Sequence, residues 1–193
     1  MIVSNTSAAT FNDMLVALRN FLSANGWTIV TDGTSGGSMV VQNSNGHKFR
    51  LDTTTTNQTD YYTGAFVDRS LRLAYDLGNV GGTGGTYSTT RTANDMAGPY
   101  PNLWFFTDED ATFCHIVAQT ASVRYAHASF GNIDNKGIHT ADIPFIAGLY
   151  WYFWSNSAIY ADNIGRGNPF NDPFNGSHEV DYVDGKAYMG IPN

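Results

Sequence analysis

The sequence predicts a mainly β protein of the α+β class: an antiparallel β-sandwich-like domain with one N-terminal amphipathic helix and an extended C-terminal arm. An apolar stripe at helical spacing near the N-terminus and many short aromatic or β-branched segments between polar turns predict the domain. A tail rich in Asn, Gly, Pro and Asp predicts the arm. With 193 residues, the chain suits one domain with a core better than two large ones. We place the domain at residues 1–154 and the arm at 155–193.

One helix is predicted, with an apolar stripe that begins at Phe11 and a stop at the Asn-Gly pair 25–26. Its apolar side chains fall three and four positions apart, on one stripe: Phe11, Met14, Leu15, Leu18, Phe21 and Leu22. Thr10 or Ser7 can cap its start, Asp13 suits its first turn, and the Asn-Gly pair at 25–26 is a natural stop. A strand is expected to begin at Trp27. The stripe must then pack on a sheet or on a partner.

The sheet strands are predicted from alternation and turns. Segments 38–42 and 47–51 flank a loop that ends in Asn-Gly, which is typical of a hairpin. Segments 66–68 and 70–76 are expected to pair, with Leu71, Leu73 and Tyr75 on one face. Further strands are expected at 103–106, 112–118, 123–130 and 145–153, with turns at 108–110 and 119–121.

A glycine-rich segment begins at Gly78 and continues toward Pro101. A phosphate-binding loop would need a Gly-Lys-Ser/Thr ending, or Gly-x-Gly-x-x-Gly opening a helix. Neither a lysine nor a helical period follows here. We expect a flexible surface loop that contacts a neighbouring subunit, with Gly82 and Gly85 as interface candidates.

The arm carries a tandem repeat, Asn-Pro-Phe-Asn at 168–171 and Asp-Pro-Phe-Asn at 172–175. Each proline holds the chain extended. Each phenylalanine would contribute roughly 1.5–3 kcal/mol if it were buried. The sequence leaves open whether the arm docks on an adjacent copy or wraps over its own domain. The interface candidates here are Pro169, Phe170, Pro173 and Phe174.

The residue types that perform chemistry form no catalytic, cofactor or metal motif. His115 and His127 lie on adjacent predicted strands and could face each other, where packing or hydrogen bonding is favoured over a metal site. Cys114 lies mid-strand and is expected to be a small core residue. The three acids at 108–110 are expected to point to solvent from a turn. Because only two glutamates are present, a glycosidase pair has few candidates. We predict no enzyme and no cofactor.

Charge excludes one class of partner. The net charge is −7, and the few Lys and Arg residues form no cluster of the kind that displaces counterions from nucleic acid. Charged residues make up 14% of the chain, against about 25% in typical soluble domains, which suits packing against other subunits. The aromatic run at 149–154 is too short to span a membrane, and no export signal is expected at the N-terminus.

The segment from Phe130 through Gly131 and Asn132 to Gly137 follows a tryptophan-bearing strand at 103–108 and the segment from Val117 to His127. Together with an N-terminal helix that leads into Gly26-Trp27, this pattern resembles a group of virion proteins of tailed bacteriophages. The resemblance covers residues 11–137, and the arm lies outside it. It implies a structural component of the neck, tail or baseplate that is present in many copies. In that pattern the strand ends in an aromatic-Gly-Asn turn, and no catalytic residues carry over.

We therefore predict a structural virion protein that forms a ring at the head-to-tail neck (collar) or tail, assembled in the host cytoplasm. Its partners would be other copies of itself and neighbouring portal, connector or tail proteins, through heterologous contacts. Exposed arginines would add little by pairing with acids across subunits: Arg50, Arg69, Arg72, Arg91 and Arg124.

Two rivals remain open. One is a baseplate or host-surface carbohydrate-binding module, whose aromatic side chains at 150–154 would stack on sugars. Strand alternation sends these side chains to opposite sides, which speaks against it. The other is a cell-wall-degrading enzyme.

Overall fold

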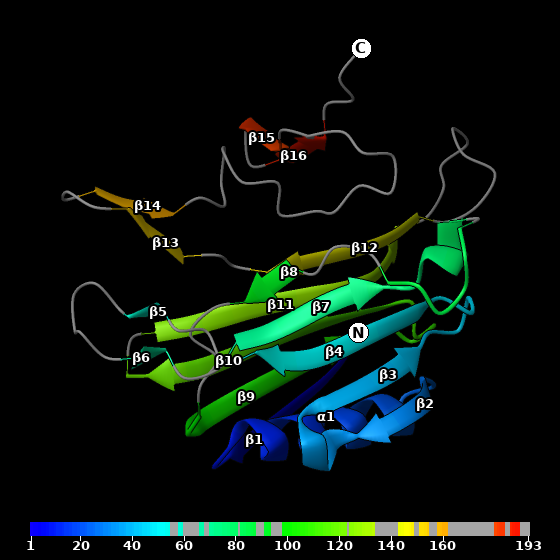
Figure 1. Ribbon diagram of the computed structural model, residues 1–193, viewed down its shortest axis with the longest axis horizontal. Coiled ribbons are helices and arrows are strands. Elements are labelled where there is room, and N and C mark those ends of the chain that lie inside the picture. Colours follow the sequence, from blue (N-terminus) through cyan, green and yellow to red (C-terminus); the bar gives the residue numbers. More distant parts are fainter. Residues whose placement is uncertain are drawn as a thin grey trace.

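A computed structural model describes the backbone of residues 1–54, 58–59, 66–67, 70–80, 82–87, 91–93, 98–122, 124–133, 143–148, 151–154, 158–161, 180–183 and 186–189. Two five-stranded antiparallel sheets and one α-helix account for most of this part of the chain (Figure 1). The prediction of a mainly β fold with an N-terminal helix is confirmed.

The two large sheets have different strand orders. The first sheet runs β1 (Ile2–Ala8), β9 (Tyr100–Thr107), β10 (Phe113–Ala121), β11 (Arg124–Ile133) and β12 (Ile143–Gly148). The second sheet runs β2 (Thr28–Gly33), β3 (Ser38–Gln42), β4 (Lys48–Thr54), β7 (Ser70–Tyr75) and β8 (Arg91–Ala93). Short 3-10 turns occupy η1 (Thr34–Gly36) and η2 (Leu77–Val80). Three two-stranded pairs complete the described elements: β5 (Gln58–Thr59) with β6 (Phe66–Val67), β13 (Trp151–Trp154) with β14 (Ala158–Ala161), and β15 (Val180–Val183) with β16 (Lys186–Met189).

The helix α1 (Phe11–Ala24) begins and ends where its sequence predicts. Thr10 is the N-cap: its hydroxyl accepts a hydrogen bond from the Asp13 N–H at 3.1 Å, and the Asp13 carboxylate accepts one from the Thr10 N–H at 3.0 Å. This reciprocal pair is a capping box, and it satisfies two N–H groups that the helix leaves unpaired. The helix stops at Asn25, and Gly26 follows with a φ of 86°, a conformation that glycine adopts without strain.

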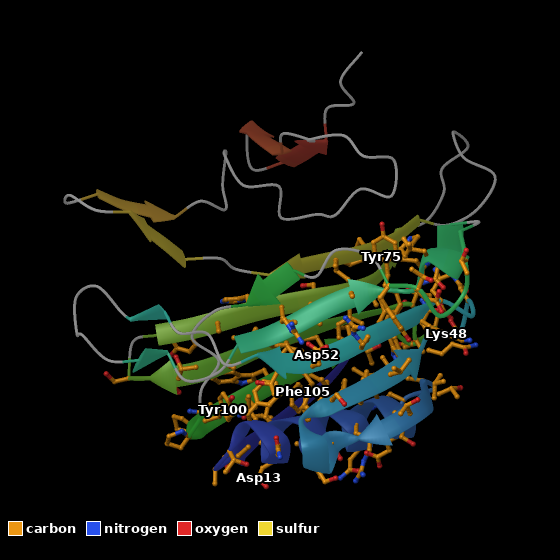
Figure 2. All side chains as sticks on the ribbon, in the orientation of Figure 1. Asp13, Lys48, Asp52, Tyr75, Tyr100 and Phe105 are labelled. Atoms are coloured by element: carbon orange, nitrogen blue, oxygen red, sulfur yellow. The ribbon has the colours of Figure 1, made fainter. Side chains whose placement is uncertain are left out.

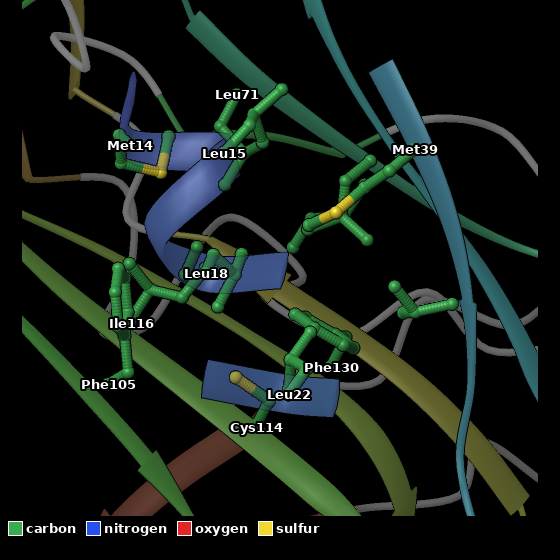
Figure 3. Close-up of a cluster of buried hydrophobic side chains, with 14 of the residues drawn as sticks. Met14, Leu15, Leu18, Leu22, Met39, Leu71, Phe105, Cys114, Ile116 and Phe130 are labelled. Carbon is green, nitrogen blue, oxygen red and sulfur yellow. The ribbon is translucent and has the colours of Figure 1, made fainter. Parts of the chain in front are cut away.

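The core lies between the two sheets. Helix α1 lies beside β1 and β2 at one edge of the layered strands, and its apolar stripe is buried there (Figures 1 and 3). Phe21 of α1 contacts Phe105 of β9, with ring centroids 5.7 Å apart. Deeper in the core, Phe49 of β4 contacts Phe130 of β11 at 5.5 Å, so side chains of the two sheets meet directly. Trp27 contacts both of these rings. Each such side chain contributes roughly 1.5–3 kcal/mol on full burial.

Two strand predictions are wrong. Segment 70–76 does not pair with its neighbour 66–68: β7 pairs with β4, which sets Tyr75 opposite Phe49 and Leu73 opposite Leu51 in the core. The short strand β6 pairs with β5 instead. The single strand predicted at 145–153 is two strands, β12 and β13, which belong to different sheets.

Two turn predictions are also wrong. Strand β10 continues through Ala121, where a turn was expected at 119–121. Strand β11 continues through Ile133, so Phe130, Gly131 and Asn132 lie within a strand and not in a turn. The predicted hairpin of β3 and β4, and the turn at 108–110, are confirmed.

The boundary predicted between residues 154 and 155 falls between β13 and β14, which pair with each other. The candidates Pro169, Phe170, Pro173 and Phe174 belong to segment 162–179, which lies outside the described residues. The arm and its interface role therefore stay predictions. In the described part of the chain, no helix is long and apolar enough to span a bilayer.

Candidate functional site

The side of the first sheet that faces away from the core carries an unusual set of side chains, and we call it the outer face. Its residues alternate with buried ones along β9, β10 and β11, and with half-buried ones along β1. The described members are Val3, Asn5, Ser7, Asn102, Trp104, Phe106, Phe113, His115, Val117, Gln119, Tyr125, His127 and Ser129. Among these members there is no Asp, Glu, Lys or Arg, although the chain carries a net charge of −7.

Strand register arranges the outer face in rows. The first row runs Val3, Phe106, His115 and Ser129; the second runs Asn5, Trp104, Val117 and His127; the third runs Asn102, Gln119 and Tyr125. Neighbours in a row lie directly opposite each other on paired strands, close enough for their side chains to touch. Aromatic and aliphatic groups are therefore contiguous across four strands.

Ring contacts occur both between and within these rows. Trp104 and Tyr125 have ring centroids 6.2 Å apart, and Phe106 and His115 have theirs 5.8 Å apart. Tyr125 is 44% exposed and Val3 is 54% exposed, whereas Trp104 and Phe106 are half-buried by their neighbours. A contiguous apolar surface of this kind in contact with water is typical of a binding surface.

A polar pair lies beside the Trp104–Tyr125 contact. The Asn102 side-chain amide donates a hydrogen bond of 2.7 Å to the Gln119 side-chain carbonyl. Together the two amides and the two rings form a neutral platform with both apolar and hydrogen-bonding groups.

The two histidines predicted to face each other do so. His127 Nδ1 lies 3.4 Å from His115 Nε2, and the hydroxyl of Ser129 lies 2.6 Å from His115 Nδ1. Burial lowers the pKa of His115, and the charge of His127 lowers it further. Burial also lowers the pKa of His127. Both imidazoles are therefore neutral at neutral pH.

The second sheet turns a charged face outward. Asp52 of β4, which is labelled in Figure 2, forms ion pairs with Arg72 Nε at 2.5 Å and with Arg50 Nε at 3.2 Å. The Arg50 guanidinium lies 4.7 Å from the centre of the Tyr87 ring. Arg50 and Arg72 thus pair within their own chain. The side chains of Arg69, Arg91 and Arg124 lie outside the described residues.

The glycine-rich segment is organised around Asp76. The Asp76 carboxylate is buried and accepts hydrogen bonds from the N–H groups of Gly78 at 2.9 Å and Gly85 at 3.0 Å. Gly85 has a φ of 80°, and a Cβ on Gly82 would lie 2.9 Å from the Leu77 carbonyl oxygen. The N–H groups of Gly78 and Gly85 therefore bind the Asp76 carboxylate of the chain itself in place of a phosphate. Both Gly82 and Gly85 are exposed, and their interface role stays a prediction.

The Phe130-Gly131-Asn132 segment has a structural role in the chain itself. Asn132 is buried and pairs with the buried Asn43 side-chain amide, which also donates to the Thr112 carbonyl at 3.2 Å. A Cβ on Gly131 would lie 2.5 Å from Phe113 Cα. The hydrogen bonds of Asn43 fasten the loop between β3 and β4 to the ends of β10 and β11.

The three acids at 108–110 differ in their exposure to solvent. Glu109 and Asp110 are exposed as predicted, but Asp108 is half-buried. Burial alone would raise the pKa of Asp108, yet hydrogen bonds from the Thr112 hydroxyl and from the N–H groups of Thr112 and Phe113 outweigh burial and lower it. The prediction that Asp108 points to solvent is therefore wrong. The turn places its carboxylate at the start of β10, where it accepts hydrogen bonds from Thr112 and Phe113. Cys114 is buried as predicted, and burial raises the pKa of its thiol.

The described residues contain no group of three or more His, Cys, Asp or Glu side chains placed to hold a metal ion. The strongest feature of this part of the chain is therefore the outer face, a surface rather than a pocket. No model of a known protein family matches the chain, and neither does any curated protein.

Proposed function

We propose that this chain is a structural virion protein of a tailed bacteriophage, which assembles in many copies into a ring at the head-to-tail neck or tail. The outer face is its contact surface for the next copy. The observation that carries the proposal is an uncharged, aromatic sheet face on a strongly acidic chain. The phage assignment rests on the resemblance over residues 11–137.

Charge explains why self-association would use this face. Copies that each carry −7 repel one another, and burying unpaired charges between them would cost free energy. A contact through an uncharged face buries no charge of that face and keeps the acidic groups farther apart, which reduces both penalties. Protein interfaces are also enriched in aromatic residues and depleted in charged ones at their centres.

The rows of the outer face supply anchors of the required kind. Trp104 and Tyr125 contact each other, and Val3 and Phe106 continue the apolar surface to the edge strand β1. A few aromatic anchors usually carry most of the binding energy of an interface. In a closed ring, this face meets a different surface of the neighbour, and the charged face of the second sheet is free to meet other virion proteins.

The experiment is an inventory of purified phage particles by quantitative mass spectrometry, joined to electron microscopy of the purified chain. We expect the chain in many copies per particle, and rings on the grid that are absent for Trp104→Glu. A chain that is absent from particles contradicts the virion assignment. Wild-type monomers at every concentration, alone and with portal or tail neighbours, contradict the ring.

A carbohydrate-binding module is a second candidate, favoured by the Trp104–Tyr125 ring contact beside the Asn102–Gln119 amide pair. Aromatic rings can stack on sugar faces while amides bind hydroxyls. A glycan array distinguishes the two functions: specific binding that Trp104→Ala removes, by a chain that stays monomeric, favours the module. The earlier candidates of the run at 150–154 have side chains outside the described residues.

A further inference from the structure

The facing nitrogens of the histidine pair on the outer face lie farther apart than in a usual N–H hydrogen bond. His115 on β10 and His127 on β11 have ring centroids 5.5 Å apart and ring planes inclined by 36°. Their facing nitrogens, His115 Nε2 and His127 Nδ1, are 3.4 Å apart. Hydrogen bonds from N–H groups are usually shorter, about 2.9–3.0 Å.

The same separation matches a metal chelate. Zinc lies about 2.0–2.1 Å from each imidazole nitrogen in a tetrahedral site. At the tetrahedral angle, two such nitrogens are separated by about 3.3–3.4 Å, by trigonometry from that bond length. The observed N···N separation of 3.4 Å is therefore the one that a tetrahedral ion requires.

We propose that His115 Nε2 and His127 Nδ1 chelate one late-transition divalent metal ion of the zinc class. Two coordination positions remain on the solvent side for water or another ligand. Imidazole nitrogens suit zinc, nickel and copper, whereas magnesium and calcium prefer oxygen ligands.

Ser129 supplies the orienting contact that metal-binding histidines usually have. Its hydroxyl lies 2.6 Å from His115 Nδ1 and can accept the proton of that nitrogen. This hydrogen bond leaves the lone pair on Nε2, the nitrogen that faces His127. Partners of this kind fix the tautomer and ring orientation of a ligating histidine.

The surroundings keep both ligands neutral. Phe106 and Ser129 lie on either side of His115 in its row, and Val117 lies beside His127. The described outer-face residues include no charged side chain that would hold a proton on either ring. Because burial lowers both pKa values, protons compete with the metal only at more acidic pH than for an ordinary histidine.

The inference shares the outer face with the proposed assembly but does not rest on it, because both histidine ligands belong to one chain. The test is calorimetric titration of the full chain with zinc chloride at pH 7.5. We expect one saturable site per chain, binding at least about tenfold weaker in His115→Gln and in His127→Gln, and roughly tenfold weaker in Ser129→Ala. The control variants His47→Gln and His178→Gln should bind as the wild type does, and magnesium should give no saturable heat.

A second measurement needs no variant: nickel ions should broaden the ring resonances of His115 and His127 before those of the other histidines.

A third measurement is thermal unfolding. Zinc should raise the melting temperature of the wild type but not of the double variant His115→Gln/His127→Gln, and a chelator should reverse the effect. The absence of saturable zinc binding overturns the proposal. Equal binding by the wild type and the folded His115→Gln/His127→Gln variant overturns it as well.

Discussion

Val3 and Phe106 lie directly opposite each other on β1 and β9, on the side of the first sheet that faces away from the core. Val3 is 54% exposed, so this apolar pair extends the first row of the outer face to the edge strand β1, where it is in contact with water. The pair exists because β1 adds to the edge of a sheet whose other strands come from residues 100–148. The N-terminal segment thereby extends the uncharged surface.

Gly131→Ala should destabilise the protein by about 1–3 kcal/mol, as overpacking does in a tight contact. Its Cβ would lie 2.5 Å from Phe113 Cα, which belongs to backbone that cannot move alone. Urea unfolding measures the change. Gly84→Ala is the matched control, because a Cβ there meets nothing within 4 Å. Equal stability of the two variants would show that β10 and β11 do not approach this closely.

Asn43→Ala should cost about 1–3 kcal/mol, because it removes the hydrogen bonds that the buried Asn43 amide donates to the Asn132 side-chain carbonyl and to the Thr112 carbonyl. The free energy of unfolding should be measured for Asn43→Ala, Asn132→Ala and the double variant. We expect the double variant to lose less than the sum of the single losses. Strict additivity would contradict the contact between the two amides.

Acidification should destabilise the protein through the histidine pair. The folded-state pKa values of His115 and His127 lie below the ordinary value of 6.5. Between that value and the lowered ones, the unfolded chain binds more protons, so the free energy of unfolding falls as pH falls. Below the lowered values the loss reaches a plateau. The contribution of the neutral pair to the free energy of unfolding is fully present above about pH 6.5.

Urea unfolding between pH 7.5 and pH 5, with chelator present, measures this loss. The His115→Gln/His127→Gln variant should show a smaller loss over the same range, with the remainder due to other groups. The same pH dependence in both proteins would place the titration elsewhere.

Thr10→Ala should lower the free energy of unfolding by about 1 kcal/mol, because it removes the side-chain half of the capping box of α1. Thermal unfolding followed by circular dichroism checks this. Thr31→Ala, on the exposed strand β2, is the control and should change stability little. If Thr10→Ala leaves the free energy of unfolding unchanged, packing alone defines the start of the helix.

The parts of the fold that the sequence predicts correctly depend on neighbours in the chain. Helix α1 follows from its apolar period, and the hairpin of β3 and β4 follows from its Asn-Gly loop. The pairing of β7 with β4 depends instead on burying Leu73 against Leu51, residues brought together only by the fold. Strand β1 was not predicted because its inward positions include the polar Ser4 and Thr6.

The outer face also escapes prediction from local sequence. In β9 the four residues Leu103 to Phe106 are all apolar, so alternation does not say which pair enters the core. The structure buries Leu103 and Phe105 and turns Trp104 and Phe106 outward. The facing of His115 and His127 was predicted from adjacent strands, but their separation depends on register and rotamers.

One pair of variants tests the central claim most directly, that copies associate through the outer face. Val3 and Val30 are both exposed valines on strands, but Val3 belongs to the outer face and Val30 to β2 of the second sheet. Sedimentation velocity should give the same large species for the wild type and Val30→Glu, and monomers for a folded Val3→Glu. A Val3→Glu variant that assembles as the wild type does would contradict the account.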